Sequence, residues 1–463
     1  MLNRDRGSPL TLSARTAIAA SQLLERTQYR RAVEAAIWGM PVVNYDLMFQ
    51  AFSALGGAMN QIVYWSRLLD WKNQTLTPNP DAIYIMPFFD TATAGPMVIE
   101  IPPAEGGSIT GTIMDCWQTP LEDVGPAGVD GGKGGKYVVL PPGHAGPAPE
   151  GFIALRCQTY QGYALLRSIL ESGSDEDFAK AVVYGGRIRI YPLSAAANPL
   201  ETVWRDAADT VFDATIPYDV RFFESLARMV EGQPWLERDR AMIDPLRTLG
   251  IAKGQPFAPD ASTKAILQDA AEEARAWLDL GYEASLDPPF YPRGHWALPA
   301  QPDMLKAMQS FYADPDSYPV DGRGMTYTMA FFCPKRPAAG SYYLMTTRDK
   351  DGHPFDGSAT YRLTVPPGAP VRQYWSATAY DRETHSLVRN VERASRSSQN
   401  AELQLNADGA AELFFGPAAP PERDSNWVPT DPARGFEVLF RFYGPDKSLF
   451  EKTWVLPDLE KVG

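Results

Sequence analysis

The spacing of apolar residues changes several times along the chain. Between residues 33 and 55 they recur every three or four positions, as in a helix with one buried face, and Pro41 inside this stretch predicts a break into two short helices. From residue 58 to about 198 the pattern becomes short runs of β-branched and aromatic residues, such as 97–101 and 137–140, each ended by Pro or Gly. Such runs are typical of antiparallel strands with tight connections.

Helical spacing returns between about 200 and 312 and gives way to strands again after residue 342. The clearest helical stripe includes Ile266, Ala270 and Ala274, and the clearest later strand is 436–443. We therefore expect a mainly β fold with helical segments. Its expected parts are N-terminal helices (1–57), a first β module (58–198), a helical middle segment (199–335) and a second β module (336–463).

Length and composition agree with a folded chain of more than one domain. The 463 residues exceed what one ordinary core requires, and 44% of them are apolar and 21% charged, which is the mixture found in globular proteins. We therefore expect two or three domains, each with its own packed core.

Charge and hydropathy argue against several classes of partner. The formal net charge is -13 and no run of Lys and Arg stands out, so nucleic acids and anionic membranes would be repelled. No apolar run approaches the roughly 20 residues that span a bilayer, and the segment 16–20 is interrupted too soon by polar residues to serve as an export signal. We expect a cytoplasmic protein that acts on a small molecule, with no nucleic-acid or membrane partner.

Cysteine and histidine are scarce. Cys116, Cys157 and Cys333 are the three cysteines, and the four histidines form no pair spaced along a helix face. The sequence therefore predicts no disulfide framework, no bound metal and no organic cofactor, and the cysteines are expected to be small core residues.

Short polar and aromatic motifs occur in a fixed order along the two strand-rich parts. They lie at 77–84, 125–143, 189–193, 349–357, 374–381, 426–429, 441–443 and 454–457. In order and spacing they resemble a two-module family whose halves are known as domains of unknown function 1254 and 1214. The resemblance implies two jelly-roll-like antiparallel β-sandwiches, helices at the start and in the middle, and assembly as a homo-oligomer. It implies no particular reaction, because a fold does not confer a function. Ala82 departs from the pattern, since many members have Thr there.

The polar residues of the first motif are the strongest candidates for chemistry. Asn79, Asp81 and Tyr84 bring an amide, a carboxylate and a phenol within six residues, and such groups bind a substrate, accept a proton and donate one. Asp115 follows a predicted strand and would add a second carboxylate across a cleft. We therefore predict Asp81, Tyr84 and Asp115 as catalytic and Asn79 as substrate-binding. The alternative is that Asn79, Asp81 and Asp115 close turns and Tyr84 only packs.

Three further residues are predicted to bind the substrate. Trp117 lies beside Asp115, and Arg167 and Arg189 lie on segments expected to border the first sheet. A guanidinium there would hold a substrate carboxylate or would form a structural ion pair with Asp81 or Asp115.

The second module carries an aromatic and polar set that consists of Trp375, Asn426, Trp427 and Arg441. Such residues bind a sugar face or an apolar ring. The alternative is that they form the core and the corner of the sandwich.

Two functions of different class follow from these residues. The first is a cofactor-independent hydrolase or lyase that uses carboxylate and tyrosine acid–base chemistry on a small organic or glycan-like substrate. The second is a non-catalytic ligand-binding or oligomeric assembly protein, which burial of Asp81 against Arg167 or Arg189 would favour. A weaker third hypothesis is metal-assisted catalysis through Asp and Glu ligands.

Overall fold

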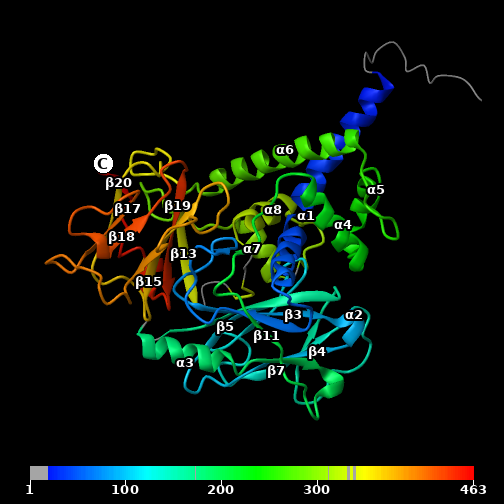
Figure 1. Ribbon diagram of the computed structural model, residues 1–463, viewed down its shortest axis with the longest axis horizontal. Helices are drawn as coiled ribbons and strands as arrows, with labels where there is room; N and C mark the ends of the chain where they lie inside the picture. Colours follow the sequence, from blue (N-terminus) through cyan, green and yellow to red (C-terminus); the bar gives the residue numbers. More distant parts are fainter. Residues whose placement is uncertain (1–18, 171, 173, 311, 331–333, 337–339) are drawn as a thin grey trace, which may run out of the picture.

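The computed structural model describes residues 19–463 apart from 171, 173, 311, 331–333 and 337–339. Residues 16–18 and Cys333, considered above, therefore lie outside the described residues. Figure 1 shows two strand-rich modules side by side, with a group of helices that lies above the first module and beside the second. Within the described ranges, no helix combines the length and the apolar character needed to cross a bilayer. The prediction of a mainly β fold with helical segments is confirmed.

The N-terminal segment forms one helix, α1 (Ala20–Ala54), with Pro41 inside it. The prediction of two short helices is therefore wrong. Pro41 cannot donate a hydrogen bond to the Ile37 carbonyl one turn earlier. Gly324 of α8 (Val320–Met329) lies against this point, where a Cβ would come within 3.0 Å of that carbonyl oxygen. Nearly every residue from 32 to 46 is buried, so tertiary packing keeps the helix continuous despite the missing bond.

The first module consists of two sheets packed face to face. Their strand orders are β11-β1-β3-β9-β5-β6 and β10-β4-β7-β8. The first sheet contains β11 (Trp204–Asp206), β1 (Gln61–Tyr64), β3 (Ile83–Asp90), β9 (Gln161–Ser168), β5 (Ile109–Asp115) and β6 (Pro120–Val124). The second contains β10 (Arg189–Pro192), β4 (Met97–Ile101), β7 (Gly135–Leu140) and β8 (Ile153–Arg156). Most pairings are antiparallel, whereas β1–β11 and β7–β8 at the sheet edges are parallel.

The six-stranded sheet is buried on both faces. Ile85 and Phe89 of β3 point into the core between the two sheets. Tyr84, Met86 and Phe88 alternate with them and join a second core formed with the helices. The helices over this face include α1, α4 (Val220–Gly232), α6 (Ala261–Ser285) and α8.

The second module is also a pair of sheets, with strand orders β13-β19-β15-β16 and β18-β17-β14-β20. The first contains β13 (Ser341–Thr346), β19 (Phe436–Tyr443), β15 (Trp375–Asp381) and β16 (Ser395–Ser397). The second contains β18 (Trp427–Pro429), β17 (Ala411–Gly416), β14 (Tyr361–Val365) and β20 (Glu460–Lys461).

The remaining elements are short connections and helices. They are β2 (Asn73–Gln74), α2 (Thr91–Ala94), α3 (Asp175–Gly185), η1 (Leu193–Ala195), β12 (Phe212–Asp213), η2 (Glu237–Met242), α5 (Ile243–Arg247), α7 (Pro302–Gln309), η3 (Asp424–Asn426) and α9 (Lys447–Phe450).

Strand β19 of the second module lies where the two modules meet, and both of its faces are buried. Its aromatic and aliphatic residues at 436, 438, 440 and 442 point into the core of the second sandwich. The alternate residues Glu437, Leu439, Arg441 and Tyr443 point the other way and are nevertheless all buried. An antiparallel sheet often leaves such a polar face in water. Here the polar face lies against the first module and the helices, and it carries one wall of the candidate site.

Candidate functional site

The turn after β2 links the first module to the second. Asn79 is buried in this turn and its backbone N–H donates to the Tyr84 hydroxyl at 3.0 Å, while its side-chain oxygen accepts from the Asp81 N–H at 3.1 Å. Its Nδ2 donates to the hydroxyl of Tyr443 at 2.7 Å and to that of Tyr374 at 3.3 Å. Asn79 therefore closes the turn and also joins the two modules.

Asp81 is buried at the same interface. Its Oδ1 accepts a hydrogen bond from the Ser395 hydroxyl at 3.0 Å, and its Oδ2 has no hydrogen-bond partner among the described residues. Burial raises the pKa of Asp81, although the Ser395 hydrogen bond and the charge of Arg441 act in the opposite direction. The carboxyl group is thus held inside the interface, and in the described part of the chain it forms no ion pair with Arg167 or Arg189.

Tyr84 and Arg167 are neighbours across β3 and β9. The Arg167 Nε donates to the Tyr84 hydroxyl at 3.0 Å, and its guanidinium carbon lies 5.1 Å from the centre of the Tyr84 ring. Because Arg167 is 6% exposed, this pair brings a cationic group into the interior from the first module.

Arg441 approaches from β19 of the second module and is 2% exposed. Its guanidinium donates to neutral oxygens: the hydroxyls of Thr378 at 2.9 Å and Tyr380 at 2.6 Å, and the carbonyls of Thr77 at 2.9 Å and Pro78 at 3.4 Å. Within the described residues, no carboxylate lies at ion-pair distance from Arg441. Its positive charge is therefore hydrogen-bonded but not neutralised by a direct partner.

A cavity of about 150 Å³ lies between these two walls, and we call it the inner pocket. Its polar lining residues are Thr77, Tyr84, Arg167, Thr326, Ser341, Tyr342, Tyr343 and Arg441. The apolar part of the wall includes Leu165, Leu298, Leu305, Met329, Met345 and Leu439. A cavity of this size, when lined by apolar side chains, holds a molecule about as large as benzene.

Tyr343 of β13 lies between the two arginines. The Ser341 hydroxyl donates to its hydroxyl at 2.9 Å, and the Arg441 guanidinium carbon lies 5.5 Å from its ring centre. Burial alone would raise the pKa of Tyr343, but the charges of Arg167 and Arg441, with hydrogen bonds to Ser341 and Tyr443, lower it below 10.0. Burial and the neighbouring Tyr343 raise the pKa of Tyr443. Tyr343 is therefore the phenol of this pair that ionises first.

A larger cleft of about 510 Å³ adjoins the inner pocket, and we call it the outer cleft. It is lined by residues of both modules, among them Thr110, Asp123, Arg372, Gln373 and Tyr443. The two cavities have the wall residues Arg167, Pro334 and Ser341 in common. Because Arg372 and Gln373 are exposed, the outer cleft reaches the surface.

Asp115 and Trp117 lie elsewhere, beneath the helices. The Asp115 Oδ1 accepts from the Thr119 N–H at 2.8 Å, and burial raises the pKa of Asp115 against the opposing charges of Arg238 and Arg323. The Trp117 ring packs on Trp38 with centres 4.7 Å apart, and its carbonyl accepts from Arg323 at 2.9 Å. Neither residue belongs to the lining of the inner pocket or the outer cleft.

Arg189 is also apart from the cavity. It lies on β10 at an edge of the four-stranded sheet, above the ring of Tyr191 at 5.4 Å, and donates to the Pro199 carbonyl at 3.4 Å. The seven residues predicted from sequence thus separate into three places. Asn79, Asp81, Tyr84 and Arg167 meet at the module interface, Asp115 and Trp117 lie together under the helices, and Arg189 lies alone.

Two groups of the inner pocket were not assigned to it from the sequence. Tyr343 was not singled out, and Arg441 was grouped with Trp375, Asn426 and Trp427, which do not line the pocket. Trp375 packs in the core of the second sandwich, and the Asn426 side chain bonds the carbonyls of Gln404 and Glu412. The sequence signal that points to Arg441 is alternation, because Arg441 lies between Phe440 and Phe442 along one strand.

The chemistry of the inner pocket is that of an anion site with an apolar floor. Guanidinium and phenol groups donate hydrogen bonds to carboxylates and similar anions, and these bonds are stronger where water is excluded. Among the described residues, no three His, Cys, Asp or Glu side chains are grouped as metal ligands.

Comparisons with known proteins give the chain a family but no activity. Residues 59–192 match the family described as protein of unknown function DUF1254, and residues 340–447 match the one described as protein of unknown function DUF1214. Both matched segments contribute Tyr and Arg side chains to the inner pocket: Tyr84 and Arg167 come from the first, and Tyr342, Tyr343 and Arg441 from the second.

Solved structures extend the likeness over nearly the whole chain. The VPA0106 protein from Vibrio parahaemolyticus is 19% identical, with 94% of this chain and 100% of that chain covered and a TM-score of 0.58, which shows a common fold. A putative uncharacterized protein from Burkholderia cenocepacia is 12% identical, with 96% and 97% covered and a TM-score of 0.43. No curated protein matches the chain.

Proposed function

The chain belongs to the two-module family that joins DUF1254 to DUF1214, and we propose that its modules together bind a small organic acid with an apolar body in the inner pocket. The anionic group of the ligand would lie against Arg441 and Arg167. The apolar body would fill the space beside Leu298, Leu305 and Met329.

The observation that carries this proposal is the buried charge of Arg441. Removing a guanidinium from water costs several kcal/mol, and neutral acceptors recover less of this cost than a carboxylate does. Asp81 is near enough for Arg441 to affect its pKa, but its carboxyl group bonds Ser395 and is not at ion-pair distance from Arg441, so it is no direct counter-ion. A bound anion would supply the missing charge at the wall of the cavity.

The lowered pKa of Tyr343 also supports this proposal. A buried phenol ordinarily titrates above its usual range, because burial disfavours the charged form. The opposite direction at Tyr343 reflects the positive charge of Arg167 and Arg441 together with hydrogen bonds to Ser341 and Tyr443. A ligand carboxylate would experience the same positive potential.

The apolar wall selects the rest of the ligand. Burial of each CH₂ group contributes about 0.8 kcal/mol, so an aromatic ring or a short alkyl chain adds several kcal/mol when it fits. A cationic ligand would be repelled by the two guanidinium groups. A neutral ligand of the same shape would leave the charge of Arg441 uncompensated.

The test compares benzoate, benzyl alcohol and benzylamine as ligands of equal ring size and different charge. Benzoate at about 100 times its Kd should stabilise the fold by about 2.7 kcal/mol, which a thermal melt detects as a higher Tm. Benzyl alcohol should do so weakly and benzylamine not at all. The Arg441→Gln variant should lose the response to benzoate, and Arg441→Lys should keep part of it.

The matched control is Arg205→Gln, because Arg205 is an exposed arginine on β11. It should respond to benzoate as the wild type does. The proposal would be contradicted if the wild type and Arg441→Gln responded equally to benzoate while circular dichroism showed that both proteins were folded.

Of the three residues predicted as catalytic, Asp81, Tyr84 and Asp115, the one that lines the inner pocket is Tyr84. A hydrolase or lyase that used the carboxylates of Asp81 and Asp115 would need a substrate that reaches both. Neither residue lines the inner pocket or the outer cleft, so this geometry favours ligand binding as the better supported function.

A further inference from the structure

We infer that Tyr343 transfers protons in the inner pocket and that Tyr443 connects it with the outer cleft, so that a bound oxo acid exchanges protons at the carbon beside its oxo group. For its substrate class this inference rests on the proposed function. For Tyr343 itself it rests on the contacts of the phenol, which can be tested without any ligand.

The first argument is the position of the Tyr343 hydroxyl. Tyr343 lines the inner pocket, and it faces Arg167 of β9, Tyr84 of β3 and Arg441 of β19. The Ser341 hydroxyl donates to its oxygen at 2.9 Å. A hydroxyl that accepts a hydrogen bond and faces two cations is stabilised as a phenolate. It is therefore suited to accept a proton from a ligand bound in the same cavity.

The second argument is a hydrogen-bonded route away from the pocket. Tyr443 bonds the Tyr343 hydroxyl, accepts from Asn79 Nδ2 at 2.7 Å and lines the outer cleft. Its ring stacks on Tyr374 with centres 4.4 Å apart and planes inclined by 10°. The stacking and the Asn79 bond fix the Tyr443 hydroxyl beside Tyr343. A proton taken up at Tyr343 therefore has a neighbour through which it reaches the cleft.

The proposed step needs no second reactant. The Tyr343 phenolate oxygen takes the proton from the carbon next to the oxo group of the ligand. The electron pair of that C–H bond moves into the carbonyl and gives an enolate, whose negative charge the guanidinium groups stabilise. Return of a proton from Tyr343 restores the C–H bond. In D₂O the net result is replacement of hydrogen by deuterium at that carbon.

The ligand-free test is a titration of phenol absorbance at 295 nm. The wild type should show one tyrosine that ionises below the ordinary value of 10, and Tyr343→Phe should lose it. Tyr342→Phe is the matched control, because Tyr342 is the adjacent residue on β13 and burial raises its pKa. The control should keep the early ionisation. Absence of that ionisation from the wild type, or its persistence in Tyr343→Phe, overturns the inference.

The activity test uses phenylpyruvate, an oxo acid with a carboxylate, a ring and an acidic C–H bond, in D₂O. Proton NMR should show faster deuterium uptake at its C3 with the wild type than in buffer alone. Tyr343→Phe should reduce the protein-dependent rate about 100-fold or more, while phenylpyruvate still raises its Tm. The wild-type rate should increase with pH through the ionisation of Tyr343 and then level off.

The relay is tested by Tyr443→Phe against Tyr374→Phe. Both variants remove a hydroxyl that bonds Asn79, but Tyr374 lines neither cavity. Tyr443→Phe should slow exchange and Tyr374→Phe should leave it near the wild-type rate. Equal effects of the two would overturn the relay. If phenylpyruvate raised the Tm of no variant, the organic-acid proposal would fail, whereas the absorbance titration would still decide the role of Tyr343.

Discussion

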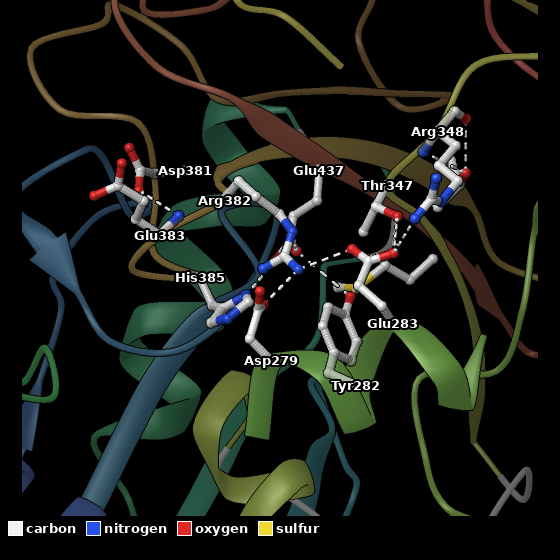
Figure 2. A network of polar contacts seen from close by, with 12 residues as sticks. Asp279, Tyr282, Glu283, Thr347, Arg348, Asp381, Arg382, Glu383, His385 and Glu437 are labelled. Carbon is white, nitrogen blue, oxygen red and sulfur yellow. Dashed lines mark hydrogen bonds and ion pairs between the residues drawn. The ribbon is translucent and has the colours of Figure 1, made fainter. Parts of the chain in front are cut away.

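Two buried charged residues on the same face of β19 have different surroundings. Glu437 and Arg441 lie four residues apart on this strand and are 0% and 2% exposed. The Glu437 carboxylate lies 2.7 Å from His385 Nδ1 and 3.9 Å from the cationic Arg382 at Nε (Figure 2). Arg441 meets neutral oxygens and a cavity. The Glu437 end, which we call the closed end, joins the second module to α6, and the Arg441 end, which we call the open end, is where we propose that an anion binds.

The closed end also supports the site. Arg382 extends the network to α6 through Asp279 at 2.6 Å and Glu283 at 2.8 Å, as Figure 2 shows. The His385 carbonyl accepts from the Thr77 N–H at 2.7 Å, and the Thr77 carbonyl in turn accepts from Arg441. The ion-pair network therefore fixes the turn that carries Asn79 and one acceptor of the pocket arginine.

The largest expected effect is at the closed end. Glu437→Gln should lower the free energy of unfolding by about 2 to 3 kcal/mol, because it weakens the buried hydrogen bond to His385 and removes the charge that faces Arg382. Urea denaturation measures the loss, and Glu451→Gln on the surface is the control. A loss below about 1 kcal/mol would mean that the Glu437 end contributes no more to stability than the Arg441 end.

The open end should be less sensitive. Arg441→Gln should cost about 1 to 2 kcal/mol in the same assay, since it removes hydrogen bonds but also a buried charge without a direct counter-ion. A cost as large as that of Glu437→Gln would mean that Arg441 holds the modules together in the same way.

Asp81 should make the stability of the fold depend on pH. Its folded pKa is raised above 3.8 by burial, so the folded state binds this proton more tightly than the unfolded state does. Its contribution to stability is therefore fully present below about pH 4 and is lost as the pH rises through the folded pKa. Asp81→Asn should remove that loss and become more stable relative to the wild type between about pH 4 and pH 7. Urea midpoints across this range would contradict the account if the difference stayed constant.

The smallest effect is expected at Arg189. Arg189→Gln should change stability by less than about 0.5 kcal/mol and leave the benzoate response unchanged, because its side chain lies at a sheet edge on Tyr191. A lost benzoate response in this variant would mean that the ligand contacts the first module at a site other than the inner pocket.

Sequence patterns found the local elements but not the way in which they dock. The strand at 436–443 and the stripe of Ile266, Ala270 and Ala274 were predictable because period two and period 3.6 belong to the strand and the helix themselves. The break at Pro41 was wrongly predicted because α8 packs against α1 where the proline removes a hydrogen bond. No local pattern carries that tertiary information.

The candidate site also depends on tertiary packing that local sequence patterns do not predict. Asn79, Asp81 and Tyr84 were found because they are neighbours in the sequence. Tyr343 and Arg441 reach the same place only because the polar face of the second module is buried against the first. Asp115 is the last residue of β5 in the same sheet, but it lies under the helices, which strand alternation does not indicate.

The most direct measurement is a crystal structure with 4-bromobenzoate, whose bromine is located by anomalous scattering. The account predicts the bromine in the inner pocket beside Leu298, Leu305 or Met329, with the carboxylate within hydrogen-bond distance of Arg441. Bromine bound elsewhere, or a ring in the pocket with its carboxylate turned away from Arg441, would contradict it.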